Sequence, residues 1–140
     1  MKLKDIRWGA ALGGMLVTEI VMIAAAFGWV AIYSYLIHPG ESPAFYKQYA
    51  MVASPWVSLI TGIPIFYFVC RWIGSHSPAR AWPTAMAIFG IFFAVDLVLM
   101  FAAGSAQVSL LFLAINYVAK FFACHFGGRH AANKRPAVTA

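Results

Sequence analysis

Four long apolar stretches constrain this chain more than any other feature of its sequence. They cover about residues 8–37, 50–73, 82–103 and 107–127, and a helix needs roughly 20 mostly apolar residues to cross a bilayer. The chain has 140 residues, of which 63% are hydrophobic and 10% are charged. Because a soluble domain has about 25% charged residues, the sequence predicts an all-α integral membrane protein built as a four-transmembrane-helix bundle.

The predicted domain organisation is a single unit with a short extension. Residues 1–128 are expected to form one four-helix transmembrane domain, and residues 129–140 a short basic cytoplasmic tail. The first apolar stretch is longer than the roughly 7–15 residues of a signal peptide core, and it contains Glu19. We therefore interpret this stretch as a membrane helix.

The distribution of basic residues predicts the orientation of the helices. Cytoplasmic connections of membrane proteins are enriched in Lys and Arg. Eight of the ten Lys and Arg residues lie at or beyond the ends of the apolar stretches on one side. On the other side, residues 38–49 carry only Lys47, and residues 104–107 carry no basic residue. Both termini are therefore expected in the cytoplasm, and the expected location is a bacterial cytoplasmic (inner) membrane.

Charged residues are rare inside the apolar stretches, and three of them lie well within: Glu19, Asp96 and Lys120. An ionised side chain near the bilayer centre costs a few kcal/mol or more, so such residues face protein or water and find partners. A rise of 1.5 Å per residue puts the three at compatible depths, with Asn116 close to the depth of Asp96. The sequence predicts one intramembrane polar cluster in which Glu19 approaches Lys120 and Asp96 approaches Asn116.

Helical periodicity assigns further residues to two kinds of helix face. Polar side chains that recur along the second and fourth stretches are expected to line an interior cavity: Ser54, Ser58, Thr61, Ser109 and Tyr117. Small side chains lie opposite Glu19 and Asp96 on the first and third stretches, and these faces are expected to contact other helices: Ala10, Gly14, Ala25, Gly28, Ala87, Gly90 and Ala94. Small residues allow helices to approach closely in a bilayer, so outward-facing stripes predict self-association or a partner subunit.

Patterns of other chemistry are absent from the sequence. There is no GxSxG setting for a nucleophile, no glycine-rich phosphate loop, and no HxxxH or CxxC spacing. The sequence therefore predicts no enzyme, no cofactor and no metal site, and the basic tail is too short for a nucleic-acid interface. Cys70 and Cys124 are expected near the cytoplasmic boundary, where thiols stay reduced.

Two functions remain compatible with the sequence. The first is a small non-enzymatic accessory or structural membrane subunit that assembles through helix contacts, as a homo-oligomer or with another membrane subunit. The alternative is a proton-coupled small-solute transporter that uses Glu19, Asp96 and Lys120 and binds a small-molecule substrate. Small multidrug transporters also have four short helices with an acid inside the first. However, the long first connection, Asp96 and Lys120 depart from their pattern, and we assign no family.

Overall fold

The computed structural model describes residues 3–102 and 109–133, which are 91% helical and contain no strand. Four of its helices are long and apolar enough to cross a membrane, which confirms the predicted helical class and the number of candidate spans. They are α1 (Trp8–Ile32), α2 (Pro43–Ser75), α3 (Ala81–Ala102) and α4 (Leu110–Ala132). A π-helical segment, η2 (Tyr33–Ile37), continues α1, and short 3-10 turns occupy η1 (Leu3–Asp5) and η3 (Pro78–Arg80).

The connection between α1 and α2 is shorter than predicted. We expected it to cover residues 38–49, but α2 begins at Pro43. Ser42 caps this helix, because its Oγ accepts a hydrogen bond from the backbone N–H of Phe45 at 3.3 Å, and proline suits the first helical position. Gly40 has a φ of +91° and makes the turn just before the cap.

The other predicted boundaries differ by a few residues or lie outside the described residues. Helix α4 runs to Ala132, so the first residues of the predicted tail 129–140 form its last turn. The predicted connection 104–107 lies outside the described residues, and so do residues 134–140.

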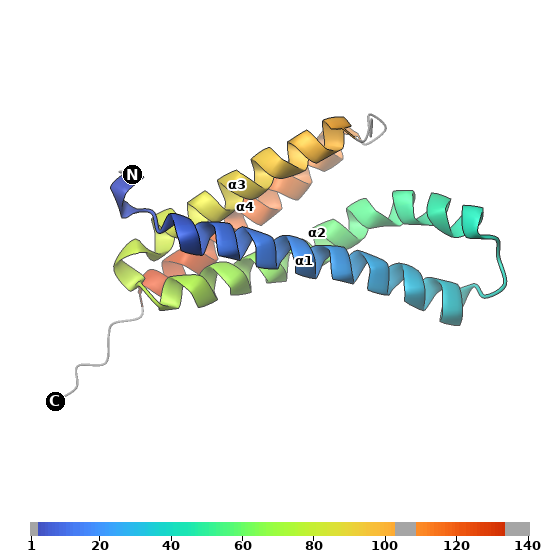
Figure 1. The fold of residues 1–140 in the computed structure, drawn as a ribbon, viewed down its shortest axis with the longest axis horizontal. Coiled ribbons are helices and arrows are strands. Elements are labelled where there is room, and N and C mark those ends of the chain that lie inside the picture. Colours follow the sequence, from blue (N-terminus) through green and yellow to red (C-terminus); the bar gives the residue numbers. More distant parts are fainter. Residues whose placement is uncertain (1–2, 103–108, 134–140) are drawn as a thin grey trace.

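The four helices lie side by side at one end of the molecule, and the α3–α4 hairpin leans away from the α1–α2 hairpin toward the other end (Figure 1). We call the closed end the packed half and the rest of the four helices the forked half. The packed half consists of residues 8–19, 62–75, 81–92 and 120–132. All buried residues of the four helices lie in the packed half except Ala53, Asn116 and Tyr117.

Close backbone contact explains the density of the packed half. A Cβ atom added to Gly127 of α4 would lie 2.5 Å from the backbone oxygen of Tyr67 in α2. A Cβ on Gly14 of α1 would lie 2.5 Å from Cδ1 of Ile73 and 2.8 Å from Cδ1 of Ile88. The sequence analysis placed Gly14 on an outward face, and this was wrong: the helices of the same chain use that glycine to approach one another.

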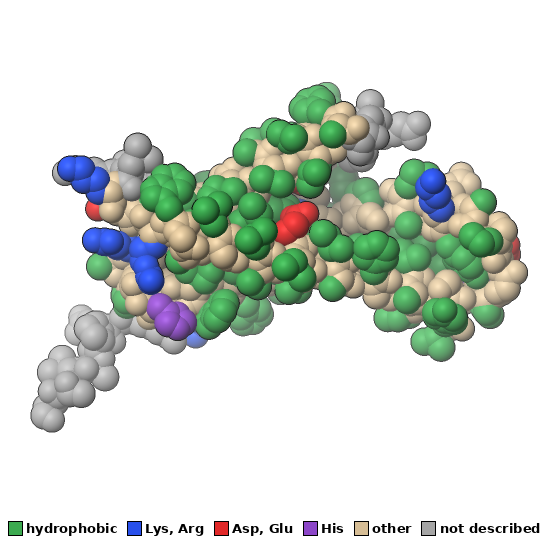
Figure 2. Space-filling model, in the orientation of Figure 1, with side chains coloured by type: hydrophobic (Ala, Val, Ile, Leu, Met, Phe, Trp, Pro, Cys, Tyr) green, Lys and Arg blue, Asp and Glu red, His purple; other side chains and the backbone are tan. Residues whose placement is uncertain are grey.

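The two hairpins differ in length. Helix α1 with η2 has 30 residues and α2 has 33, whereas α3 has 22 and α4 has 23. At 1.5 Å per residue the first hairpin is about 45–50 Å long and the second about 33–35 Å. The first hairpin therefore extends well beyond the second in the forked half, as Figure 1 shows. Apolar side chains cover much of the molecular surface, and Lys and Arg side chains gather at the end of the packed half (Figure 2).

Candidate functional site

Lys120 of α4 is the most unusual residue of the structure, because its side chain is completely buried. Its ammonium donates a hydrogen bond to Oγ of Ser58 in α2, with an Nζ–Oγ distance of 2.8 Å. The same Nζ lies 4.9 Å from the ring centre of Phe92 in α3 and 6.0 Å from that of Phe66 in α2. A cation over an aromatic face is attracted by the ring, so α2 and α3 together hold the charged end of the lysine.

Gly62 makes room for this lysine. A Cβ added to Gly62 would lie 2.6 Å from Cε of Lys120. Ser58, Gly62 and Phe66 follow one another at intervals of four residues and therefore share one face of α2. This face supplies a hydrogen-bond acceptor, a notch and an aromatic ring in successive turns.

Asp96 of α3 pairs with a tyrosine. The hydroxyl of Tyr117 in α4 donates to Oδ2 of Asp96 at 2.7 Å, and the tyrosine ring packs edge-on against Phe93 with ring centres 4.7 Å apart. The sequence analysis predicted Asn116 as the neighbour of Asp96, whereas the adjacent residue Tyr117 forms the bond. The longer tyrosine side chain carries a donor that reaches α3.

Asn116 of α4 carries a buried acceptor without a partner among the described residues. Its side chain is 7% exposed, and its Oδ1 has no hydrogen-bond partner among the described residues. Asn116 precedes Lys120 by one helical turn, so the two side chains share a face of α4. A buried carbonyl oxygen without a donor is costly, which makes this atom a natural ligand for a cation or a polar hydrogen.

Glu19 of α1 is half-buried, and its carboxylate has no direct partner among the described residues. Its charge interacts with those of Asp96 and Lys120, so the three residues lie within electrostatic reach of one another. No described residue forms a hydrogen bond to its carboxylate or an ion pair with it within 4.0 Å. Glu19 and Lys120 therefore form no ion pair within 4.0 Å, and the ammonium bonds to Ser58. The wider proximity predicted for the two side chains stays a prediction.

Two of the four predicted cluster residues thus make defined polar contacts, Asp96 with Tyr117 and Lys120 with Ser58. That Glu19 and Asn116 join them in one cluster stays a prediction. The other candidate cavity-lining residues behave differently from one another. Thr61 donates to the backbone oxygen of Val57 in its own helix at 2.6 Å. Ser54 lines a small cavity of about 240 Å³ between α1 and α2. Ser109 is exposed at the start of α4 and lies outside the cluster.

Some residues of the predicted helix-contact faces are buried against other helices of the chain, and others are exposed. Gly14 and Ala87 are buried within the bundle. A Cβ on Gly28 or Gly90 would meet no atom within 4 Å. The exposed members are Gly28, Gly90 and Ala94, and the half-buried ones are Ala10 and Ala25.

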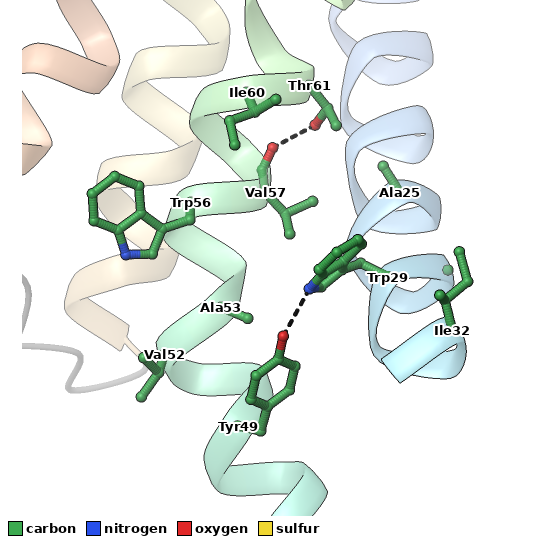
Figure 3. A pocket seen from close by; sticks show the side chains of 11 residues that line it. Ala25, Trp29, Ile32, Tyr49, Val52, Ala53, Trp56, Val57, Ile60 and Thr61 are labelled. Atoms are coloured by element: carbon green, nitrogen blue, oxygen red, sulfur yellow. Dashed lines mark hydrogen bonds between the residues drawn. The ribbon is translucent and has the colours of Figure 1, made fainter. Parts of the chain in front are cut away.

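An apolar groove of about 730 Å³ lies between α1 and α2 in the forked half. Trp29 of α1 and Tyr49 of α2 meet across it, because Nε1 of Trp29 donates to the tyrosine hydroxyl at 3.0 Å (Figure 3). Ala25, Gly28 and Ala53 leave space between these aromatic side chains. The walls of this groove are mostly apolar, so the pattern of polar residues in the sequence did not predict it.

Sulfur and nitrogen ligands do not converge on a metal site in the described part of the chain. Sγ of Cys70 and Sγ of Cys124 lie 3.2 Å apart as free, buried thiols between α2 and α4. Nδ1 of His125 accepts from the indole of Trp82 at 3.1 Å. No group of three or more His, Cys, Asp or Glu side chains that would hold a metal occurs among the described residues.

Comparison with known protein families, with curated proteins and with solved structures finds no match for this chain.

Proposed function

We propose that this protein is a non-enzymatic accessory or structural subunit of a membrane complex. In this proposal its four helices insert in a bacterial inner membrane with both termini in the cytoplasm. The basic residues support this orientation, since Arg7, Arg71, Arg80 and Arg129 lie near the ends of helices in the packed half. Figure 2 shows this concentration of positive charge, which is typical of a cytoplasmic face.

The observation that carries the proposal is an exposed pair of glycines on α1. Gly9 and Gly13 are both exposed, and a Cβ on either would meet no atom within 4 Å. They form a GxxxG spacing, which brings two membrane helices into close backbone contact. Lipid chains pack equally well against larger side chains, so an exposed GxxxG pair favours a second helix as the neighbour.

The exposed small residues of α3 support the same interpretation. Gly90 and Ala94 are one turn apart, and neither is covered by another part of the described chain. A glycine in a helix interior costs roughly 0.5–1 kcal/mol relative to alanine. A partner helix that packs against Gly90 would offset this cost, whereas lipid would not.

Native mass spectrometry from a mild detergent tests the assembly. The wild-type chain of 15.3 kDa should appear as a homo-oligomer or together with another membrane protein. Gly13→Leu and Gly90→Leu should shift the mass toward the monomer, because a leucine separates closely packed backbones. The control is Ala114→Leu, which enlarges an exposed side chain on the outer side of α4. A monomeric wild type without any partner would disprove the proposal.

A second function, proton-coupled transport of a small solute, is favoured by Glu19. This carboxyl lies in the cluster without a direct ion pair or hydrogen bond from the described residues, so it is open to a proton and to a substrate. In vesicles that contain the protein and a pH indicator, adding tetraphenylphosphonium should drive proton movement. Glu19→Gln should abolish that movement, and proton movement equal to that of empty vesicles would exclude transport of this cation class.

A further inference from the structure

We propose that the polar cluster binds one alkali-metal cation, which exchanges with a proton, through the side-chain oxygens of Glu19, Asp96 and Asn116. The proposal concerns ion binding alone. It holds whether the protein assembles with a partner or works as a monomer, and whether or not it moves a solute across the membrane.

The charge balance of the cluster is the first argument. Glu19 and Asp96 are acids, and among the described residues Lys120 is the base whose charge acts on both. Fully ionised, the three side chains carry one net negative charge. An uncompensated charge inside a bundle of apolar helices is costly, so the cluster is neutral only when it holds one additional positive charge, either a proton or a bound cation.

The position of Lys120 is the second argument, because it leaves the acids open. Its ammonium bonds to Ser58 at 2.8 Å and lies over the ring of Phe92. No described basic group lies within 4.0 Å of the carboxylates of Glu19 or Asp96. The fixed lysine offsets one negative charge from a distance while the carboxylate oxygens remain available to a second cation.

The available oxygens are the third argument. Oδ1 of Asn116 belongs to a side chain that is 93% buried, and it has no partner among the described residues. Oδ2 of Asp96 accepts from Tyr117, and Oδ1 of the same carboxylate forms no hydrogen bond with the described residues. Hard cations prefer carboxylate and amide oxygens, and a single positive charge is what the cluster lacks.

The exchange is balanced in charge and atoms. A protonated carboxyl of Glu19 or Asp96 loses its proton to water, and the alkali-metal ion takes its place beside the resulting carboxylate. The titratable groups beside these carboxylates come from three helices: Glu19 from α1, Asp96 from α3, and Tyr117 and Lys120 from α4. Helix α2 contributes the neutral hydroxyl of Ser58. Binding must therefore weaken as pH falls, because protons compete for the same carboxylate.

Thermal unfolding of the full-length protein in detergent tests the proposal. The protein is kept in choline chloride, which is then replaced by NaCl, KCl or LiCl at constant ionic strength. At least one alkali chloride should raise Tm by about 3–6 °C when it reaches ten times its Kd. Below the pH at which the carboxyl titrates, the half-saturating concentration should increase about tenfold per pH unit.

Proton release gives a second readout that needs no variant. Adding the stabilising salt to protein in weak buffer with a pH indicator should release up to about one proton per chain, whereas choline chloride should release none. Asp96→Asn, Glu19→Gln and Asn116→Ala should each abolish or weaken both signals at least tenfold. The matched control is Glu41→Gln, an exposed acid outside the cluster. Equal Tm values in all four salts at pH 6, 7 and 8, together with no proton release, would overturn the proposal.

Discussion

The packed half and the forked half are built from the same four apolar helices, yet the chain holds them together in different ways. In the packed half, glycine and alanine bring backbones into contact, as at Gly127 and Tyr67. In the forked half the two hairpins diverge, and the main contacts are aromatic side chains such as Trp29 and Tyr49. The chain therefore packs one end tightly against itself, whereas the helices at the other end have fewer contacts within the chain.

The polar cluster lies where the two halves meet. Glu19 and Lys120 are the last residues of the packed half, and Asp96 and Asn116 come just beyond it. Buried polar groups need defined partners, and both halves supply them for Lys120: Gly62 and Phe92 lie in the packed half, and Ser58 lies one turn beyond it. Glu19 has no hydrogen bond or ion pair with the described residues. The junction of the two halves therefore holds one fixed charge, the ammonium of Lys120, and one carboxyl without a partner among the described residues.

The largest expected effect breaks the closest backbone contact of the packed half. Gly127→Ala places a Cβ 2.5 Å from the oxygen of Tyr67 and 3.1 Å from Cβ of Cys70, so α2 and α4 must move apart. We expect a loss of about 2–3 kcal/mol in the free energy of unfolding, the usual cost of overpacking a dense core. Unfolding by SDS titration in mixed micelles measures it.

The matched control for this change is Gly90→Ala, since a Cβ on Gly90 meets no atom within 4 Å. This variant should unfold within about 1 kcal/mol of the wild type, and alanine favours the helix. Equal losses for both glycines would mean that the two surfaces are packed alike, and the distinction between them would fail.

The second effect tests the junction. Ser58→Ala removes the hydroxyl that accepts from Nζ of Lys120 and leaves a buried ammonium with one fewer partner. We expect a loss of about 1.5–2 kcal/mol in the free energy of unfolding, typical of a hydrogen bond to a buried charge. Ser54→Ala, one turn away on α2, should change it by less than about 0.5 kcal/mol. A silent Ser58→Ala would show that the lysine does not depend on this hydroxyl.

The third effect concerns the bond that ties α4 to α3 at the same level. Tyr117→Phe keeps the ring against Phe93 but removes the hydroxyl that donates to Asp96 at 2.7 Å. We expect a loss of about 1–1.5 kcal/mol. In a double-mutant cycle with Asp96→Asn, the losses should not add, since both changes affect one bond. Tyr67→Phe, which loses only an exposed bond to His130, is the control.

The sequence predicted the four long apolar helices correctly, and it singled out the charged residues inside them by the cost of placing a charge there. Long apolar stretches have one stable arrangement in a bilayer, and charged residues such as Glu19 and Lys120 stand out in them. The pairing inside the cluster was predicted less well. Depth along a helix follows from the rise per residue, but whether Asn116 or Tyr117 reaches Asp96 depends on side-chain length and on helix rotation, which periodicity leaves undetermined.

The sequence also did not determine which way the helix faces lined by small residues point. Gly14 was expected to face outward because it lies opposite Glu19, yet α1 turns this side toward Ile73 and Ile88. Gly14 was placed outward because Glu19 was assumed to point fully inward, whereas Glu19 is only half-buried. Two usable signals were overlooked: the GxxxG spacing of Gly9 and Gly13, and the serine and proline that start α2.

The smallest expected effect lies in the forked half, at the edge of the groove. Tyr49→Phe removes the hydroxyl that accepts from Nε1 of Trp29 at 3.0 Å. The bond is exposed, so a solvent molecule can replace the lost partner. The stacking of Tyr49 on Tyr33, with ring centres 3.7 Å apart, is unaffected by the loss of the hydroxyl. We therefore expect a change of less than about 0.5 kcal/mol in the free energy of unfolding.

Tyr49→Ala is the comparison for the small change in unfolding free energy expected of Tyr49→Phe. It removes the ring as well as the hydroxyl, and the lost stacking on Tyr33 should cost about 0.5–1.5 kcal/mol. Both variants are measured by the same SDS titration as Ser58→Ala. If Tyr49→Phe alone destabilised the chain as much as Ser58→Ala, a single exposed hydrogen bond would hold the forked half as firmly as a buried one holds the junction. The forked half would then be a second closed structure rather than a surface that depends on what surrounds it.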